Sequence, residues 1–376
     1  MEENKENVPN NQQEQEQEQQ PIQQEPTQQE QEGLEQGSLE TPDDSTATHE
    51  ATDALKDIQR LDVKLVFEST QRIKEEIAQV VVGQDDLLEY LMIGLLVRGH
   101  CLIEGLPGIA KTLTARSLAK TIDSSYSRIQ FTPDLMPTDV SGTSVFNVKE
   151  GEFFFKKGPV FASIVLIDEI NRSPAKTQAA LMEIMEEHQL TYDGKTYPME
   201  QPFFVIATQN PIEQEGTYQL PEAQLDRFIF RIKLGYPSLE EERQILELFE
   251  SDFENSKEND LKRVLSRKQI EECRGIVEQV HIKKELIDYV ARIVDNTRNN
   301  GDIYMGASPR ASLAIMKASK ALAAIRGRDF VTPDDIQHVC YPVLNHRLVI
   351  SYEREMDGST VEDIIKSILV DIEVPR

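Results

Sequence analysis

A short glycine-containing loop lies between an apolar, strand-like segment and a helical segment, and it restricts the possible folds of this chain most strongly. The sequence reads "CLIE" at 101–104, "GLPGIAKT" at 105–112 and "LTARSLAK" at 113–120. In such a loop, glycines let successive backbone N–H groups converge on phosphate oxygens, a helix N-terminus adds its dipole, and a lysine neutralises charge. The sequence therefore predicts an α/β fold with a phosphate-binding loop. A glycine-containing turn in an ordinary α/β fold is the alternative.

The residues predicted to contact a nucleotide lie in and directly after this loop. One of them departs from the usual pattern, because Ala110 stands where a glycine is typical. Alanine adds a single methyl group, so we expect the loop to accept it provided that the backbone at residue 110 keeps a negative φ. The predicted set is Gly105, Leu106, Pro107, Gly108, Ile109, Ala110, Lys111, Thr112 and Leu113.

Polar side chains follow two further apolar segments. "IVLIDEIN" (164–171) contains Asp168 and Glu169 directly after four apolar residues. An aspartate at the end of a strand can help to hold Mg²⁺, and the next carboxylate can orient an attacking water. "FFVIATQNP" (203–211) brings Asn210 to the end of another segment, where an amide could contact a phosphate or the water. Solvated acids at a strand end and an ordinary Asn-Pro turn are the alternatives.

Two arginines are further candidates for a phosphate site. Arg227 lies in "LPEAQLDRF" after Pro221, and taken alone it would be interpreted as a solvated charge. Arg310 lies in "GASPRAS", where Ser308 and Pro309 predict the start of a helix. A cation in the first turn opposes the helix dipole, which is understandable if an anion such as a phosphate lies nearby. The histidines occur singly, without the spacing of metal ligands, and we assign them no metal role.

The apolar segments predict a parallel sheet. "CLIE", "YSRIQF" (126–131), "SIVLID" (163–168) and "FFVIAT" (203–208) are mostly continuous apolar runs separated by helical patterns, as expected for strands buried on both faces. Two helical segments ending at Gly83 and Gly99 precede the first strand. Beyond Pro237 the pattern is mostly helical, with one start at Thr332. We therefore predict an α/β core at 59–236 and a helical domain at 237–376.

The N-terminal segment 1–58 is acidic and rich in Gln and Glu. Residues 1–60 contain 16 Asp and Glu against 3 Lys and Arg, which is half of the net charge of −26. With so few large apolar residues, this segment cannot offset the entropy of ordering, and we predict that it is disordered. The charge beyond this segment is also negative, which argues against nucleic acid as the main partner.

No feature of the sequence indicates export or a membrane span. The N-terminus has no basic n-region followed by an apolar h-region, and the apolar run "LMIGLLV" (91–97) is too short to cross a bilayer. The three cysteines, Cys101, Cys273 and Cys340, are far apart and have no CxxC spacing. A cytoplasmic location is therefore expected.

Two segments interrupt the alternation of strands and helices. "SVFNVKEGEFFFKKGP" (144–159) and "QLTYDGKTYPMEQP" (189–202) each predict a hairpin, with turns at 149–151 and at Asp193-Gly194. We expect them to project into a pore or toward a partner. Purely structural additions are the alternative.

Taken together, these motifs resemble those of the MoxR family of AAA+ ATPases. The resemblance covers roughly residues 65–350 and rests on "VVVGQ", "GLPGIAKT", "RIQFTPDLMPTDVSGT", "LIDEINRSPAKTQAALMEIMEE", "FVIATQNPIEQEGTYQLPEAQLDRF" and "GASPRA". The family itself uses a similar alanine in the loop. The resemblance implies an AAA+ αβα core with a helical lid, a hairpin inserted in helix 2, and a homo-hexameric ring. It also implies a chaperone-like role with partner proteins that carry von Willebrand factor A domains.

The resemblance also implies a role for each candidate residue in binding ATP and Mg²⁺. Lys111 and Thr112 would hold phosphate and Mg²⁺, Asp168 would support the metal, and Glu169 would polarise water. Asn210 would act as sensor 1 and Arg310 as sensor 2. The arginine finger, which acts on the ATP of the neighbouring subunit, would be Arg227. The segment near the adenine would contain Gly83 and Gln84.

The predicted function is Mg²⁺-dependent ATP hydrolysis by a ring-forming, chaperone-like remodeller. Two other classes remain open. One is a nucleotide-gated binding scaffold with little turnover, which the presence of Glu169 and Arg227 disfavours. A steady-state ATPase assay would distinguish this scaffold from an ATP-hydrolysing remodeller. The other is a DNA-acting motor, which the acidic balance and the lack of a basic, aromatic-rich patch disfavour.

Overall fold

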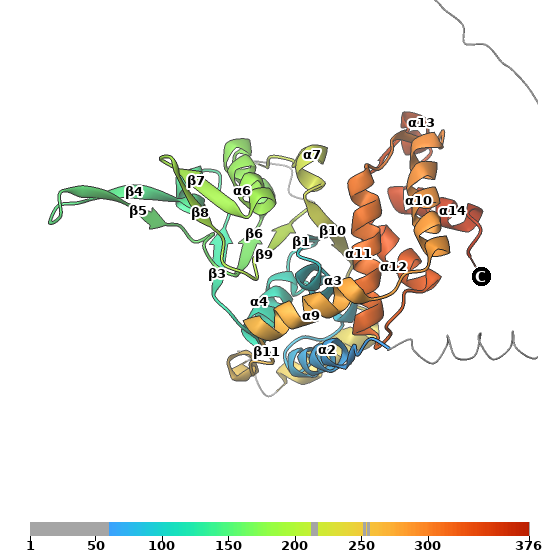
Figure 1. Cartoon of the computed structure of the whole chain (residues 1–376), viewed down its shortest axis with the longest axis horizontal. Coiled ribbons are helices and arrows are strands. Elements are labelled where there is room, and N and C mark those ends of the chain that lie inside the picture. The colour runs from blue at the N-terminus through green and yellow to red at the C-terminus, as the bar shows by residue number, and fades with distance from the viewer. Residues whose placement is uncertain (1–59, 212–216, 251–252, 254–255, 376) are drawn as a thin grey trace, which may run out of the picture. The chain divides into compact units, whose positions relative to one another are not determined.

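The computed structural model describes residues 60–211, 217–250, 253 and 256–375 (Figure 1). The acidic segment 1–58, predicted to be disordered, lies outside the described residues. Residues 59–376 form one compact unit. Within the part of the chain that is described, no helix combines the length and the apolar character needed to cross a membrane.

A five-stranded parallel sheet forms the centre of the molecule. Its strands lie in the order β10-β1-β9-β6-β3, so segments far apart in sequence become neighbours. Four of the five strands agree with the segments predicted from the sequence, whereas β10 was not predicted. The strands are β1 (His100–Gly105), β3 (Tyr126–Gln130), β6 (Ile164–Asp168), β9 (Phe204–Gln209) and β10 (Phe228–Leu234).

Both faces of this sheet are buried, which explains its continuous apolar strands. Side chains alternate between the faces, so Cys101 and Ile103 belong to one hydrophobic core and Leu102 belongs to the other. Helices α2 (Lys64–Ile77), α3 (Asp85–Leu96) and α4 (Lys111–Thr121) contribute to the first core. Helices α5 (Pro137–Ser141) and α6 (Ala175–Glu187) contribute to the second. An αβα core results, as the resemblance implied.

The segment after the sheet is mainly helical. Helices α11 and α12 begin at the predicted positions, after Ser308 and Thr332, and Thr332 forms a capping box with Asp335. The apolar faces of these helices pack into the first core, so the sheet and the helices share one hydrophobic interior. The helices are α8 (Leu239–Phe249), α9 (Arg267–Gln279), α10 (Lys284–Asn299), α11 (Pro309–Ile325), α12 (Pro333–Leu344), α13 (Tyr352–Met356) and α14 (Val361–Asp371). The short strands are β2 (Ile122–Asp123), β11 (Leu265–Ser266), β12 (Ile303–Met305) and β13 (Val349–Ile350).

Both predicted hairpins are confirmed. Strands β4 (Gly142–Asn147) and β5 (Glu152–Lys157) pair antiparallel, as do β7 (Gln189–Tyr192) and β8 (Lys195–Pro198). The β4–β5 hairpin extends away from the sheet (Figure 1). The side chain of Phe155 packs against Tyr192 and Tyr197 of the second hairpin. Toward its tip, Phe153 is 73% exposed, so this hairpin adds little to either core.

Candidate nucleotide-binding site

The predicted phosphate loop connects β1 to α4. The strand ends at Gly105 and the helix begins at Lys111. Gly108 has a φ of 86°, a conformation that glycine adopts without steric cost. The condition of a negative φ at Ala110 is not met, because this residue has a φ of 61° and a ψ of 15°.

Ala110 is the residue that immediately precedes helix α4. Its carbonyl oxygen accepts the first helical hydrogen bond from Thr114 N at 2.9 Å and a second bond from Thr114 Oγ1 at 3.0 Å. A left-handed alanine costs about 1–2 kcal/mol, and the loop accepts this cost.

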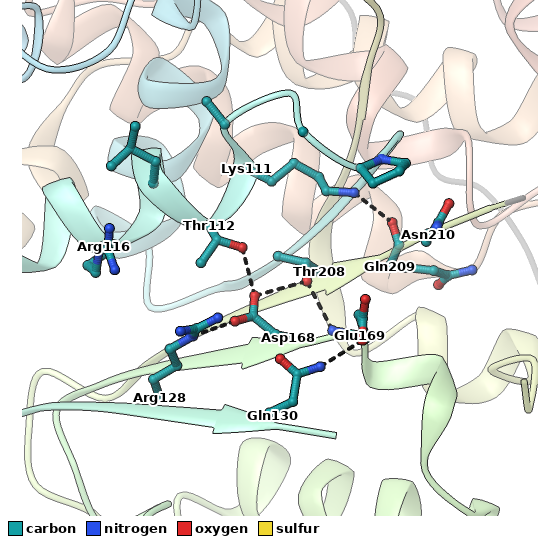
Figure 2. Close-up of a pocket in the computed structure, with 14 residues that line it drawn as sticks. Lys111, Thr112, Arg116, Arg128, Gln130, Asp168, Glu169, Thr208, Gln209 and Asn210 are labelled. Atoms are coloured by element: carbon teal, nitrogen blue, oxygen red, sulfur yellow. Dashed lines mark hydrogen bonds and ion pairs between the residues drawn. The ribbon is translucent and has the colours of Figure 1, made fainter. Parts of the chain in front are cut away.

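Lys111 extends across the loop at the end of the sheet. Its Nζ donates to the carbonyl oxygen of Gly105, and a longer contact of 3.4 Å reaches the carbonyl oxygen of Gln209 on β9 (Figure 2). The ammonium group is therefore held between the phosphate loop and the carboxyl ends of the central strands. At this position it can neutralise a phosphate bound by the loop.

The carboxylate of Asp168 lies opposite the loop and is held by two hydroxyl groups. Its Oδ1 accepts hydrogen bonds from Thr112 Oγ1 at 2.8 Å and from Thr208 Oγ1 at 3.3 Å. Its Oδ2 accepts a hydrogen bond from Arg128 Nε at 2.6 Å (Figure 2). Because the Asp168 side chain is only 6% exposed, these bonds compensate for the desolvation of its charge.

Glu169 turns its carboxylate to a different set of partners. Its φ of 57° is left-handed, and its N–H donates to Thr208 Oγ1 at 3.1 Å. The carboxylate accepts a hydrogen bond from Gln130 Nε2 at 2.7 Å and forms an ion pair with Arg172 at 3.2 Å. Backbone strain of this kind is common at functional sites, where the surrounding structure maintains it.

These groups surround a pocket of about 430 Å³. Lys111, Thr112, Asp168, Glu169 and Asn210 all line it, so the structure brings together the predicted phosphate, metal, water and sensor 1 residues. From the rest of the loop, the lining includes Pro107, Gly108, Ala110 and Leu113. Gly105, Leu106 and Ile109 do not line it.

The donor set fits Mg²⁺. Hydroxyl and carboxylate oxygens of Thr112 and Asp168 are hard ligands, and Mg²⁺ in phosphate sites takes one or two protein ligands with phosphate oxygens and waters. Within the described ranges there is no cluster of three or more His, Cys, Asp or Glu side chains that could hold a metal without such help. The site therefore suits a metal that arrives with a phosphorylated ligand.

A second, smaller pocket contains the residues predicted to lie near an adenine. Gly83 and Gln84 line a cavity of about 170 Å³ together with Lys74 on α2 and Thr114 on α4. Thr114 follows directly after Leu113, which lines the larger pocket. The first turn of α4 therefore separates the two pockets.

The two predicted arginines lie together, but they do not line the larger pocket. Arg227 Nε donates to Glu186 Oε2 at 2.7 Å, and Arg310 donates to Glu186 Oε1 at 2.8 Å. The hydrogen bond from Arg310 lowers the pKa of the Glu186 carboxyl. Arg310 also contacts Asp226 at 3.4 Å, so the anions near the start of α11 are carboxylates of this chain.

Five residues that line the larger pocket had no role predicted from the sequence. The alternation in "YSRIQ" was an available signal, because it places Arg128 and Gln130 on one face of β3 and the buried Ile129 on the other. The parallel register then aligns Gln130 with Asp168. The five residues are Arg116, Arg128, Gln130, Thr208 and Gln209.

A glycine-containing loop between a parallel strand and a helix, with a lysine, a hydroxyl and an aspartate at the strand ends, defines the P-loop nucleotide-binding class. The comparisons with known proteins agree with this class. The model of the ATPase family associated with various cellular activities (AAA) matches residues 100–230, and that of the AAA lid domain matches residues 295–368.

Individual relatives narrow this class to one family. The chaperone MoxR1 of Mycobacterium tuberculosis is 44% identical over 310 residues, covering 80% of this chain and 81% of the relative. YeaC of Bacillus subtilis is 44% identical over 301 residues, covering 80% and 93%. A crystal structure of a candidate ATPase from Cytophaga hutchinsonii matches with a TM-score of 0.77 at 40% identity, covering 87% of this chain and 99% of that one. The chain belongs to the MoxR family of AAA ATPases, which confirms the resemblance seen in the sequence.

Proposed function

We propose that this protein hydrolyses ATP with Mg²⁺ as cofactor. The observation that supports this most directly is the hydrogen bond of 2.8 Å between Thr112 Oγ1 and Asp168 Oδ1, with Glu169 beside it. This contact joins the start of helix α4, where phosphate would bind, to the end of a central strand. A hydroxyl and a carboxylate so joined form a natural binding site for Mg²⁺.

Each residue of the site then has a distinct role. The N–H groups of the loop and the ammonium group of Lys111 bind the phosphates, while Thr112 and Asp168 hold the metal. The metal, when bound, neutralises charge on the phosphate oxygens. Glu169 orients the attacking water, and Asn210, which is buried at the end of β9, contacts the γ-phosphate or that water.

We further propose that the active site is completed by a neighbouring subunit in a homo-hexameric ring. Arg227 and Arg310 share Glu186 and lie outside the pocket of their own chain, although phosphoryl transfer requires positive charge at the γ-phosphate. Arg227 would act as the arginine finger. Because Arg310 is linked to Arg227 through Glu186, its sensor 2 role would also be directed at the ATP of the neighbour.

The biological role is proposed from the family. One relative is named a chaperone, and we propose a chaperone-like remodelling role for this protein. Partner proteins with von Willebrand factor A domains, and a cytoplasmic location, remain proposals that rest on the sequence alone.

Nucleotide binding and steady-state ATPase assays test this function. We expect ATPase activity that requires Mg²⁺ in the wild-type protein, tight ATP binding with little turnover in Glu169→Gln, and no tight ATP binding in Lys111→Ala. The last variant loses the charge that faces the phosphates. ATP binding without turnover in the wild-type protein would instead indicate a nucleotide-gated scaffold. Unchanged ATP affinity in Lys111→Ala would refute the role of this lysine.

A further inference from the structure

We propose that Arg128 sets the metal dependence of nucleotide binding, because its guanidinium and a divalent cation are alternative partners of the Asp168 carboxylate. This inference rests on the proposed function and assigns Arg128 as a positioning residue that acts through Asp168. The sequence "RIQF" predicted part of a strand and contributed to the family resemblance, but neither assigned a role to its arginine.

Arg128 contacts the Asp168 carboxylate directly. Arg128 Nε lies 2.6 Å from Asp168 Oδ2, whereas the hydroxyl groups of Thr112 and Thr208 take Oδ1 (Figure 2). The oxygen that Arg128 contacts belongs to the carboxylate that is proposed to hold Mg²⁺. Two cations on one carboxylate repel each other, so binding of one weakens binding of the other.

Arg128 and Asp168 differ in burial. The Asp168 side chain is 6% exposed and is fixed at the end of a central strand, whereas the Arg128 side chain is 48% exposed on the edge strand β3. The guanidinium can therefore leave the carboxylate without opening a cavity in the core. The carboxylate stays in place for another cation.

Among the described residues that line the pocket, the other two cations contact other groups. Arg116 also lines the pocket, but its guanidinium pairs with Glu258 at 2.5 Å. Lys111 contacts carbonyl oxygens of the loop and of β9. Arg128, by contrast, forms its ion pair with the Asp168 carboxylate.

These contacts predict that Arg128 has opposite effects on the binding of metal-free nucleotide and of Mg²⁺-nucleotide. Without a divalent cation, Arg128 offsets the charge of Asp168, which would otherwise repel the phosphates of a nucleotide. With Mg²⁺, the metal performs this task and Arg128 competes with it. Loss of the guanidinium charge should therefore weaken metal-free binding by about tenfold or more, while Mg²⁺-nucleotide binding stays the same or tightens.

The test is a calorimetric titration of the full chain with ADP, once with Mg²⁺ and once with EDTA. The quantity compared is the ratio of the dissociation constant in EDTA to that in Mg²⁺. Arg128→Gln, which keeps length but loses charge, and Arg128→Ala should both raise this ratio about tenfold or more. Arg128→Lys, which keeps the charge, should remain within about threefold of the wild-type ratio.

Arg116→Ala is the matched control, because it removes a pocket cation that does not contact Asp168. It should weaken binding in both conditions by a similar factor and leave the ratio unchanged. A wild-type ratio in Arg128→Gln would overturn the inference but leave the proposed function intact. Failure of the wild-type protein to bind ADP in either condition would overturn both. Melting curves of each variant identify any loss that reflects unfolding.

Discussion

Arg227 and Arg310 each donate a hydrogen bond to a different oxygen of one carboxylate, that of Glu186. The first arginine follows the short helix α7 (Glu222–Leu225), and the second lies in the first turn of α11. One acidic side chain at the end of α6 thereby links the end of the sheet region to the helical segment. A displacement of α11 relative to α6 would disturb the contact between Arg310 and Glu186.

Asp226, the residue before Arg227, forms a second ion pair that connects the sheet region to the helical segment. Asp226 accepts a hydrogen bond of 2.7 Å from Arg347 Nε, and the Arg347 side chain is 3% exposed. The same guanidinium donates to the carbonyl oxygens of Phe228 and Val343, so it joins β10 to the end of α12. Arg347 therefore determines where the backbone that carries Arg227 lies.

Arg347→Met should reduce the free energy of unfolding by about 3 kcal/mol, because it removes the buried partner of a partly buried ion pair and leaves carbonyl groups unsatisfied. Urea denaturation measures this loss. Arg354→Met is the matched control, since Arg354 forms an exposed ion pair with Asp302 and is 44% exposed. That variant should change the unfolding free energy by no more than about 1 kcal/mol. Equal effects of the two substitutions would contradict the role of Arg347.

Arg227→Ala should retain ATP binding but lose most hydrolysis. An arginine finger contributes about 10³–10⁵ in rate, which corresponds to roughly 4–7 kcal/mol at the barrier. A surface arginine without such a role would change the rate far less. The measurements are a nucleotide titration and a steady-state ATPase assay on the same preparation.

Mixing Arg227→Ala with the inactive Glu169→Gln variant tests whether two chains share one site. At some interfaces an intact Glu169 would face an intact Arg227 of the neighbour, and part of the activity should return. If subunits exchange freely and every mixture remains inactive, Arg227 does not act across a subunit boundary.

Much of the core could be predicted from sequence because its signals are local. The strands β1, β6 and β9 are apolar runs, and the loop residues and Asp168-Glu169 follow such strands directly. Strand β10 was not predicted, because Arg231 and Lys233 interrupt the apolar residues of "FIFRIKL".

The remaining features depend on contacts between distant segments or on backbone torsion. The hydrogen bonds of Arg128 and Gln130 to the carboxylates follow from the register of β3 against β6, which one strand cannot reveal. The partner of Arg310 was expected to be a phosphate, and the structure provides the carboxylates of Glu186 and Asp226. The positive φ of Ala110 could not be predicted, because the residue type alone favours a negative φ.

Replacing Ala110 with glycine should change the free energy of unfolding by less than about 1 kcal/mol. Relief of the left-handed strain stabilises the folded chain, and the greater freedom of glycine in the unfolded chain opposes this gain. Gly108→Ala is the informative counterpart, because Gly108 has a φ of 86° and no atom lies within 4 Å of an added Cβ. That change should cost about 1 kcal/mol or more through torsion alone. A marked loss of stability in Ala110→Gly would argue for a negative φ at residue 110.

Acidification from pH 6.5 toward pH 4 should destabilise the protein through its buried histidines. Burial lowers the pKa of His100 from 6.5 to about 4, while its Nδ1 accepts a hydrogen bond from Val205 N–H and its Nε2 bonds to the carbonyl oxygen of Met185. Burial also lowers the pKa of His346.

In this pH range the unfolded chain therefore binds protons that the folded chain does not, and stability falls as the pH falls. For His100 alone the loss approaches about 3 kcal/mol near pH 4. The measurement is the free energy of unfolding in urea at several pH values between 4.5 and 6.5, made on the wild-type protein and on a His100 variant so that the titration of the shared carboxylates cancels. His100→Gln, which keeps a donor and an acceptor, should show a clearly smaller slope against pH than the wild-type protein. An unchanged slope would mean that His100 is protonated in the folded state.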